Sequence, residues 1–200
     1  MTTFRAAAFA AVLTVGFATI GATQPARGTT NTVTPVFRVR ILGDTTTGFS
    51  TRVDSYFELR GRLQRTLPAI VVTDDVRQIR RRMRSLAKAI RVARSGAIQG
   101  EFFTVATSAE FKQTLALIMD AEVCAVIMDD NPGAFNHDID GSYPEGKPRS
   151  TMPGIVLAHL PELPDDIEYR FIGPHLILYD SKANTIIDRL PNAIACKSCD

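Results

Sequence analysis

The last third of the chain limits the fold most, because short apolar runs alternate there with turn-forming residues. Three runs, Glu168–Ile172, His175–Tyr179 and Thr185–Leu190, are rich in residues that favour β-strands. The dipeptide Gly173-Pro174 separates the first two runs, and the polar segment 180–184 precedes the third. Neighbouring strands joined by such short turns pair antiparallel. The sequence therefore predicts a C-terminal β-meander.

Three helices are predicted in the middle of the chain, at about Ser50–Thr66, Asp74–Ser95 and Thr107–Met128. Apolar residues recur in these segments every three or four positions, which is the period of a helix with one buried face. In the third segment, Thr107 and Glu110 have the spacing of a capping box. This pair predicts that the third helix begins at Thr107.

The remaining segments complete the fold class. Val36–Leu42 alternates apolar residues with arginines, so we expect a half-exposed strand that would join the C-terminal sheet. Asn131–Ser150 is dense in Gly, Pro, Asp and Asn and predicts a long loop. The prolines at 153, 161 and 164 then allow only an extended or briefly helical crossing. The prediction is one α+β domain with about three central helices.

The first 22 residues have the pattern of a secretory signal peptide. Arg5 precedes the apolar run Ala6–Ala22, which ends in small residues of the kind that a signal peptidase accepts. Thr14 and Thr19 make this run a poorer match to a permanent membrane anchor, which needs about 20 apolar residues. We expect cleavage after Ala22 and membrane contact only during export.

Residues 23–35 are rich in Thr and contain two prolines, which predicts a flexible linker. The chain thus divides into a signal peptide (1–22), a linker (23–35) and a single domain (36–200), exported to the periplasm or the medium. The whole chain has 23 Lys and Arg against 21 Asp and Glu, and cleavage removes one cation, Arg5. Bulk charge therefore points to no particular partner.

The segment 74–95 concentrates positive charge, with eight Lys or Arg between positions 77 and 94 and no acid among them. A cationic helix face can bind phosphates or anionic head groups. The candidate anion-binding residues are Arg80, Arg84, Lys88 and Arg91. The alternative is a face that is only solvated or paired with acids of the same chain. Export disfavours nucleic acid, and no aromatic residue interrupts the run to stack a base. An anionic envelope component or an acidic protein is the expected partner.

The segment Asn136–Lys147 partly matches a twelve-residue calcium loop. Asn136, Asp138 and Asp140 fall at positions one, three and five, and a glycine falls at position six. Lys147 replaces the closing glutamate, which leaves Glu145 as the nearest carboxylate. A simple turn is the alternative, because Asp, Asn and Gly all favour turns. These four residues are the candidate Ca²⁺ ligands, and no other cofactor is indicated.

The chain has three cysteines, Cys124, Cys196 and Cys199, so at least one stays unpaired within a single exported chain. The last two form a CxxC motif at the extreme C-terminus. A redox site places that motif at a helix N-terminus inside a fold, so we expect a structural disulfide instead. It would join the two tail cysteines or connect Cys124 to one of them.

The segment Leu160–Ile194, together with ARSGAIQGEFF and DGSYPEG, resembles a group of uncharacterised exported bacterial proteins. The resemblance implies export and a compact domain, and it brings no established activity or catalytic residue. The chain has no Gly-x-Ser-x-Gly, HExxH, Walker or GxGxxG motif. We therefore expect a non-enzymatic binding or interaction domain. The alternative is a small exported hydrolase that would use His137 and the 136–145 loop around a metal or water.

Overall fold

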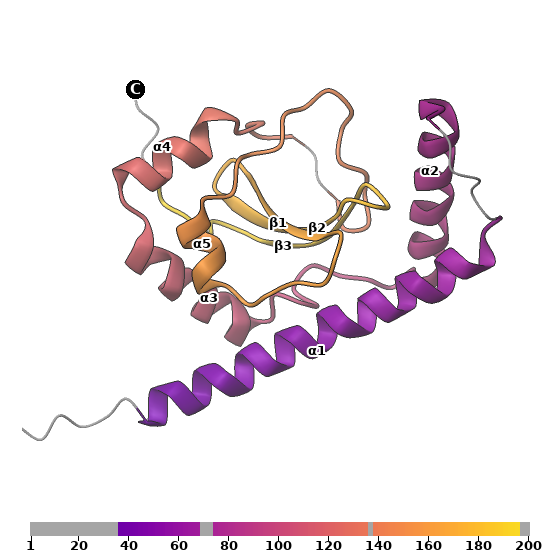
Figure 1. Ribbon diagram of the computed structural model, residues 1–200. Helices are drawn as coiled ribbons and strands as arrows, with labels where there is room; N and C mark the ends of the chain where they lie inside the picture. The colour runs from indigo at the N-terminus through magenta and orange to yellow at the C-terminus, as the bar shows by residue number, and fades with distance from the viewer. Residues whose placement is uncertain (1–35, 69–73, 136–137, 197–200) are drawn as a thin grey trace, which may run out of the picture. The chain divides into compact units, whose positions relative to one another are not determined.

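The computed structural model describes residues 36–68, 74–135 and 138–196 (Figure 1). The predicted signal peptide and linker lie outside these ranges, as do Asn136, His137 and Cys199.

Five helices precede a three-stranded sheet in the described chain. The helices are α1 (Val36–Thr66), α2 (Val76–Ala93), α3 (Val105–Ile118), α4 (Ala121–Asp129) and α5 (Gly154–His159), and the strands are β1 (Ile167–Ile172), β2 (His175–Asp180) and β3 (Thr185–Leu190). The strands lie in the order β1-β2-β3, and both pairs are antiparallel. The α+β class and the C-terminal meander are confirmed, and every strand boundary lies within one residue of its prediction.

The sheet is buried on both faces. Successive residues of a strand point to opposite sides, and each side packs in a separate cluster of buried residues. One face joins the main core with side chains from all five helices, through Tyr169, Phe171, Leu176, Leu178, Ile187 and Leu190. The other face forms a smaller cluster of Ile172, Ile177, Tyr179 and Ile186 around Tyr143. Tyr143 comes from the predicted long loop, so this loop covers the face of the sheet that the helices leave open.

The same loop also supplies hydrogen bonds to both outer strands. The backbone N–H of Asp140 donates to the carbonyl of Ile186 in β3, with 2.8 Å between N and O. At β1, the Ser150 hydroxyl donates to the Phe171 carbonyl at 3.1 Å and accepts from the Phe171 N–H at 2.8 Å. Partners at the sheet edges reduce the risk that another chain adds a strand there. The loop is therefore an integral part of the domain.

Helix α1 corrects the prediction for Val36–Leu42. This segment is the first part of α1, so the predicted N-terminal strand is wrong. Phe49, Val53 and Tyr56 follow at helical spacing and are buried in the core, where they anchor the helix. Extending an anchored helix adds about one hydrogen bond per residue fixed, at no further nucleation cost. The alternating pattern is therefore compatible with helix once the neighbouring residues are packed.

The predicted helix Thr107–Met128 is two helices, α3 and α4, so that prediction is wrong at its centre. The chain leaves helical geometry at Met119 and Asp120. The Asp120 carboxylate then accepts a hydrogen bond from the Val123 N–H at 2.8 Å. This is an N-cap, which satisfies an otherwise unpaired amide at the start of α4.

The capping box predicted at Thr107 is also wrong, because α3 begins earlier. Thr104 is the N-cap of α3, and its hydroxyl accepts from the Thr107 N–H at 3.3 Å. The carboxylate of Glu110 accepts a hydrogen bond from the Thr46 hydroxyl at 3.0 Å. Glu110 thus connects α3 to α1.

A disulfide joins Cys124 of α4 to Cys196, with 5.5 Å between the two Cα atoms. It ties the segment after β3 to the helical part of the domain. Of the pairings that the sequence left open, the structure contains this one. Disulfides persist mainly in oxidising compartments, so the bond is compatible with export. Within the described ranges, no helix has the length and apolar character needed to cross a membrane.

Candidate anion-binding site

Helix α2 has one buried face and several cationic ones. Its N-cap is Asp75, whose carboxylate accepts from the Arg77 N–H at 2.9 Å. Leu86, Ala87 and Ile90 are buried toward the core. Because successive residues turn by about 100°, the cations of α2 have different surroundings. They fall into two groups.

The first group consists of cations with acceptors in the chain. Arg82 donates to the Gln64 carbonyl at 2.9 Å. The guanidinium of Arg94 donates to the Asp140 carboxylate at 2.7 Å. Arg91 donates to the Asp140 carbonyl at 3.4 Å, and Arg80 lies 3.6 Å from the Glu145 carboxylate. Of the four predicted anion-binding residues, Arg80 and Arg91 therefore already have acceptors from the 138–147 segment. Internal pairing, the alternative raised by the sequence, describes these two.

The second group is a row of four exposed cations, Arg77, Arg81, Arg84 and Lys88, which we call the cationic stripe. None of the four has a side-chain hydrogen bond or ion pair among the described residues. Their spacing of i, i+4, i+7 and i+11 places them within a sector of about 60° and along about 16 Å of the helix. The predicted site included Arg84 and Lys88 but not Arg77 and Arg81. The helical spacing was the signal that could have identified all four.

A groove of about 350 Å³ lies between α2 and the segment 142–149. Arg80 and Arg84 contribute positive charge from the helix, and Lys147 and Arg149 contribute it from the segment. The apolar lining from α2 consists of Val76, Ile79, Met83 and Ala87. The structure thus brings the predicted anion-binding helix and the predicted calcium loop together at one groove.

The calcium-loop segment forms a tight turn. The Gly141 N–H donates to the Asp138 carbonyl at 2.9 Å. A Cβ atom at position 141 would lie 2.8 Å from the same carbonyl oxygen, so the turn requires glycine there. Asp140 has a φ of 57°, which Asp tolerates better than most residues. The segment therefore makes the turn that was the alternative interpretation of its sequence.

Two of the predicted metal ligands are engaged by arginines at separate points of α2. Asp140 pairs with Arg94 and Glu145 with Arg80, and these arginines lie about 21 Å apart along the helix axis. Among the residues that the structure describes, no group of three or more His, Cys, Asp or Glu could hold a metal ion. Since Asn136 lies outside those residues, calcium binding stays a prediction.

The Asp140–Arg94 pair is buried and fixes the end of α2. The whole Asp140 residue is 3% exposed and the Arg94 side chain is 7% exposed. Loss of water around the carboxyl raises the pKa of Asp140 to about 6, and the neighbouring Arg94 opposes part of that rise. The Arg94 guanidinium also lies 5.3 Å from the ring centroids of Tyr56 and Phe102. Arg94 thereby connects α2, α1 and the loop.

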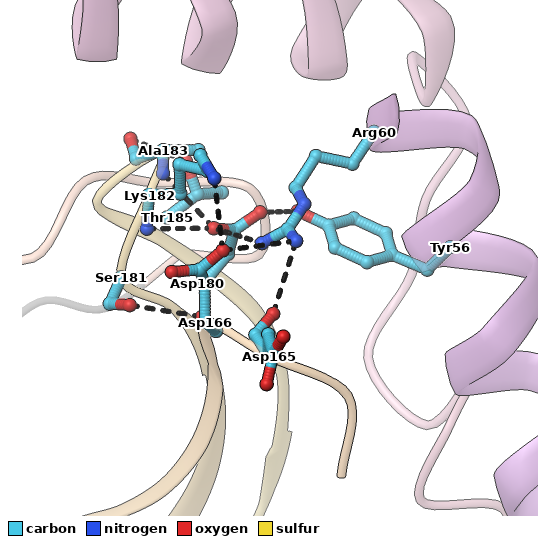
Figure 2. A network of polar contacts seen from close by, with 9 residues as sticks. All are labelled: Tyr56, Arg60, Asp165, Asp166, Asp180, Ser181, Lys182, Ala183 and Thr185. Atoms are coloured by element: carbon cyan, nitrogen blue, oxygen red, sulfur yellow. Dashed lines mark hydrogen bonds and ion pairs between the residues drawn. The ribbon is translucent and has the colours of Figure 1, made fainter. Parts of the chain in front are cut away.

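A second buried network joins α1 to the turn between β2 and β3 (Figure 2). Asp180 accepts hydrogen bonds from the Tyr56 hydroxyl at 2.8 Å and from Arg60 at 3.2 Å. It also accepts from the backbone N–H groups of Lys182 at 2.9 Å and Ala183 at 3.0 Å. Burial and the adjacent carboxylate raise the pKa of Tyr56 well above its usual value, which keeps the hydroxyl a donor. The network therefore connects α1 to the sheet at the end of β2.

Asp188 of β3 has a similar structural role. It is fully buried, and its carboxylate accepts from the N–H groups of Gly100, Phe102 and Phe103 at 2.8–2.9 Å. It also accepts from the N–H of Arg189 at 2.7 Å. A carboxylate with four amide donors is well compensated for burial. This network could not be predicted from local sequence patterns, because Asp188 and the 100–103 segment are far apart along the chain.

The two described histidines make short-range contacts to the backbone. The Nδ1 atom of His159 lies 2.8 Å from the Ile155 carbonyl, and that of His175 accepts from the Asn192 N–H at 3.0 Å. Neither histidine lines the groove beside α2. Both contacts connect the histidine rings to the backbone of the fold.

A larger groove, of about 880 Å³, lies between α3, α4 and the segment 192–195, beside the disulfide. Its lining is dominated by Ala, Leu, Ile and Met, with a single cation, Lys112. Size alone would favour this groove. The candidate anion-binding site remains on α2, because the row of four exposed cations is there.

Comparison of the chain with protein-family models, with curated proteins and with solved structures finds no match. The geometry and charge of α2 are therefore the features that indicate a function.

Proposed function

We propose that this protein is an exported, non-enzymatic binding domain that holds an anionic partner through the cationic stripe of α2. The observation that carries the proposal is the row of four exposed cations without partners among the described residues. Among the described residues, the acids that contact α2 pair with Arg80 and Arg94 and not with the four cations of the stripe. The positive charge of the stripe is therefore available to a partner.

The stripe has enough charge for measurable binding. A cation close to an anionic surface contributes about 1 kcal/mol, so four contribute about 4 kcal/mol. At about 1.4 kcal/mol per factor of ten, this corresponds to an affinity gain of several hundredfold. Exposed charges are screened by salt over about 8 Å at physiological ionic strength. Binding should therefore weaken steeply as salt is added.

Export is the second part of the proposal. It is supported by the signal-peptide pattern of the first 22 residues and by the Cys124–Cys196 disulfide. In the cell envelope the expected partner is an anionic envelope component. Intact mass of the protein recovered from fractions of an exporting bacterial host tests this part. We expect a chain that begins at Thr23 and contains one disulfide, whereas an uncleaved cytoplasmic chain would contradict it.

The binding part is tested by retention on immobilised dextran sulfate. The variant Arg81→Gln/Arg84→Gln/Lys88→Gln should elute at much lower salt than the wild type. The matched control is Arg62→Gln/Arg65→Gln/Lys112→Gln, which removes the same charge from exposed positions on α1 and α3. The control should elute close to the wild type. Equal shifts for both variants would show that only net charge matters and would refute the assignment to α2.

A further inference from the structure

We infer that the anionic partner is a phospholipid surface, against which the stripe face of α2 lies flat. This inference rests on the proposed function and specifies the partner of the same site. It replaces the expectation from the sequence that the chain contacts a membrane only during export. It follows from an exposed apolar side chain that continues the row of cations on α2 and from a second one just beyond the helix.

The stripe continues into an apolar residue. Val92 lies one turn beyond Lys88, at the same spacing that relates Arg77 to Arg81, and it is 69% exposed. Ile98, in the segment that follows α2, is 71% exposed. The face of α2 that presents four cations thus ends in an apolar side chain that the domain does not cover.

This combination matches the chemistry of a membrane interface. Interfacial helices place Lys and Arg among anionic head groups and insert apolar side chains at the boundary with the acyl chains. Long basic side chains can also keep their charge at the head groups while their aliphatic stems lie against apolar material. A purely polyanionic chain would use the cations and leave Val92 in water. The exposed valine therefore favours a lipid surface over a soluble polyanion.

The geometry of the row also fits a planar array of charges. Four cations within about 60° of one helix face can all approach one plane at the same time. The opposite face of α2 packs in the core through Leu86 and Ile90. The helix can therefore dock as part of the folded domain, and no residue needs to leave its place in the core.

The test is co-sedimentation of the processed protein with vesicles. One set is made of phosphatidylcholine alone and the other contains about one third phosphatidylglycerol. We expect at least tenfold stronger binding to the acidic vesicles, and about a hundredfold loss of that binding in the Arg81→Gln/Arg84→Gln/Lys88→Gln variant, at roughly fivefold per cation. Comparing the two vesicle types cancels any contribution that does not depend on lipid charge.

Val92→Ser separates a lipid surface from a soluble polyanion. This variant should bind acidic vesicles about fivefold more weakly and keep its retention on dextran sulfate. Val105→Ser, which alters another exposed valine, should change neither. Retention on dextran sulfate without vesicle binding, or equal effects of the two serine variants, would overturn the lipid inference and leave the proposed function standing. A wild type that binds neither acidic vesicles nor dextran sulfate would overturn the lipid inference and the proposed function together.

Discussion

The Cys124–Cys196 disulfide should account for a large part of the stability of the domain. The bond closes a sequence separation of 72 residues, so it greatly restricts the unfolded chain. The loop-entropy relation gives about 4 kcal/mol at 25 °C for a loop of this size. Typical small domains unfold with 5 to 15 kcal/mol in total. We therefore expect Cys196→Ser to lower the free energy of unfolding by about 4 kcal/mol.

Urea unfolding, followed by circular dichroism, measures this effect. The wild type should be compared in oxidised and reduced form with Cys196→Ser and with the control Cys199→Ser. Reduced wild type and Cys196→Ser should unfold at similarly low urea, and Cys199→Ser should resemble the oxidised wild type. A Cys199→Ser variant that is as unstable as Cys196→Ser, or a wild type unaffected by reductant, would refute the assigned pairing.

Two further predictions concern the buried charges. Because the folded chain raises the pKa of Asp140 to about 6 from 3.8, its carboxyl binds a proton before that of the unfolded chain as pH falls. Stability from this group therefore rises by about 1 kcal/mol between pH 7 and pH 5. Urea titrations should show that the gain is missing in Asp140→Asn, and a constant difference between the two proteins would contradict this. Arg60→Met leaves Asp180 buried without its cation and should lower the free energy of unfolding by about 3 to 5 kcal/mol. The control Arg62→Met, at an exposed position, should lower it by less than about 0.5 kcal/mol. Equal urea midpoints for the two variants would refute the role of Arg60.

The strands were predictable because local chemistry fixes their turns. Gly173 between β1 and β2 has a φ of 53°, and Asn184 before β3 has a φ of 51°. Gly and Asn are the residues that most readily adopt this left-handed geometry. The turn positions therefore divide the apolar runs almost without ambiguity. Helix α2 was similarly clear, because its apolar period extends over several turns.

The errors arose where packing outweighs local pattern. Val36–Leu42 has the alternation of a strand, but it continues a helix that Phe49 and its neighbours anchor in the core. The division of Thr107–Met128 into α3 and α4 depends on the cap at Asp120, a signal that was present in the sequence and was outweighed by the continuous apolar period.

The candidate site was only half predictable, since pairing between distant residues decides which charges are free. The basic residues of α2 are visible in the sequence. That Glu145 pairs with Arg80 and Asp140 with Arg94 depends on how the 138–147 segment lies against the helix. Arg91 likewise donates to the Asp140 carbonyl. The cations of α2 that have no side-chain partner among the described residues are therefore those of the cationic stripe.

The salt dependence of binding to dextran sulfate is the sharpest test of whether the cationic stripe of α2 binds an anionic partner. For a polyanion, each cation that takes part in binding adds nearly one to the slope of log K against log salt concentration. The triple Gln variant of Arg81, Arg84 and Lys88 should therefore have a shallower slope, smaller in magnitude by about two to three. The triple Gln control at Arg62, Arg65 and Lys112 should keep the wild-type slope. The same slope for the wild type and the stripe variant would contradict the assignment of binding to α2.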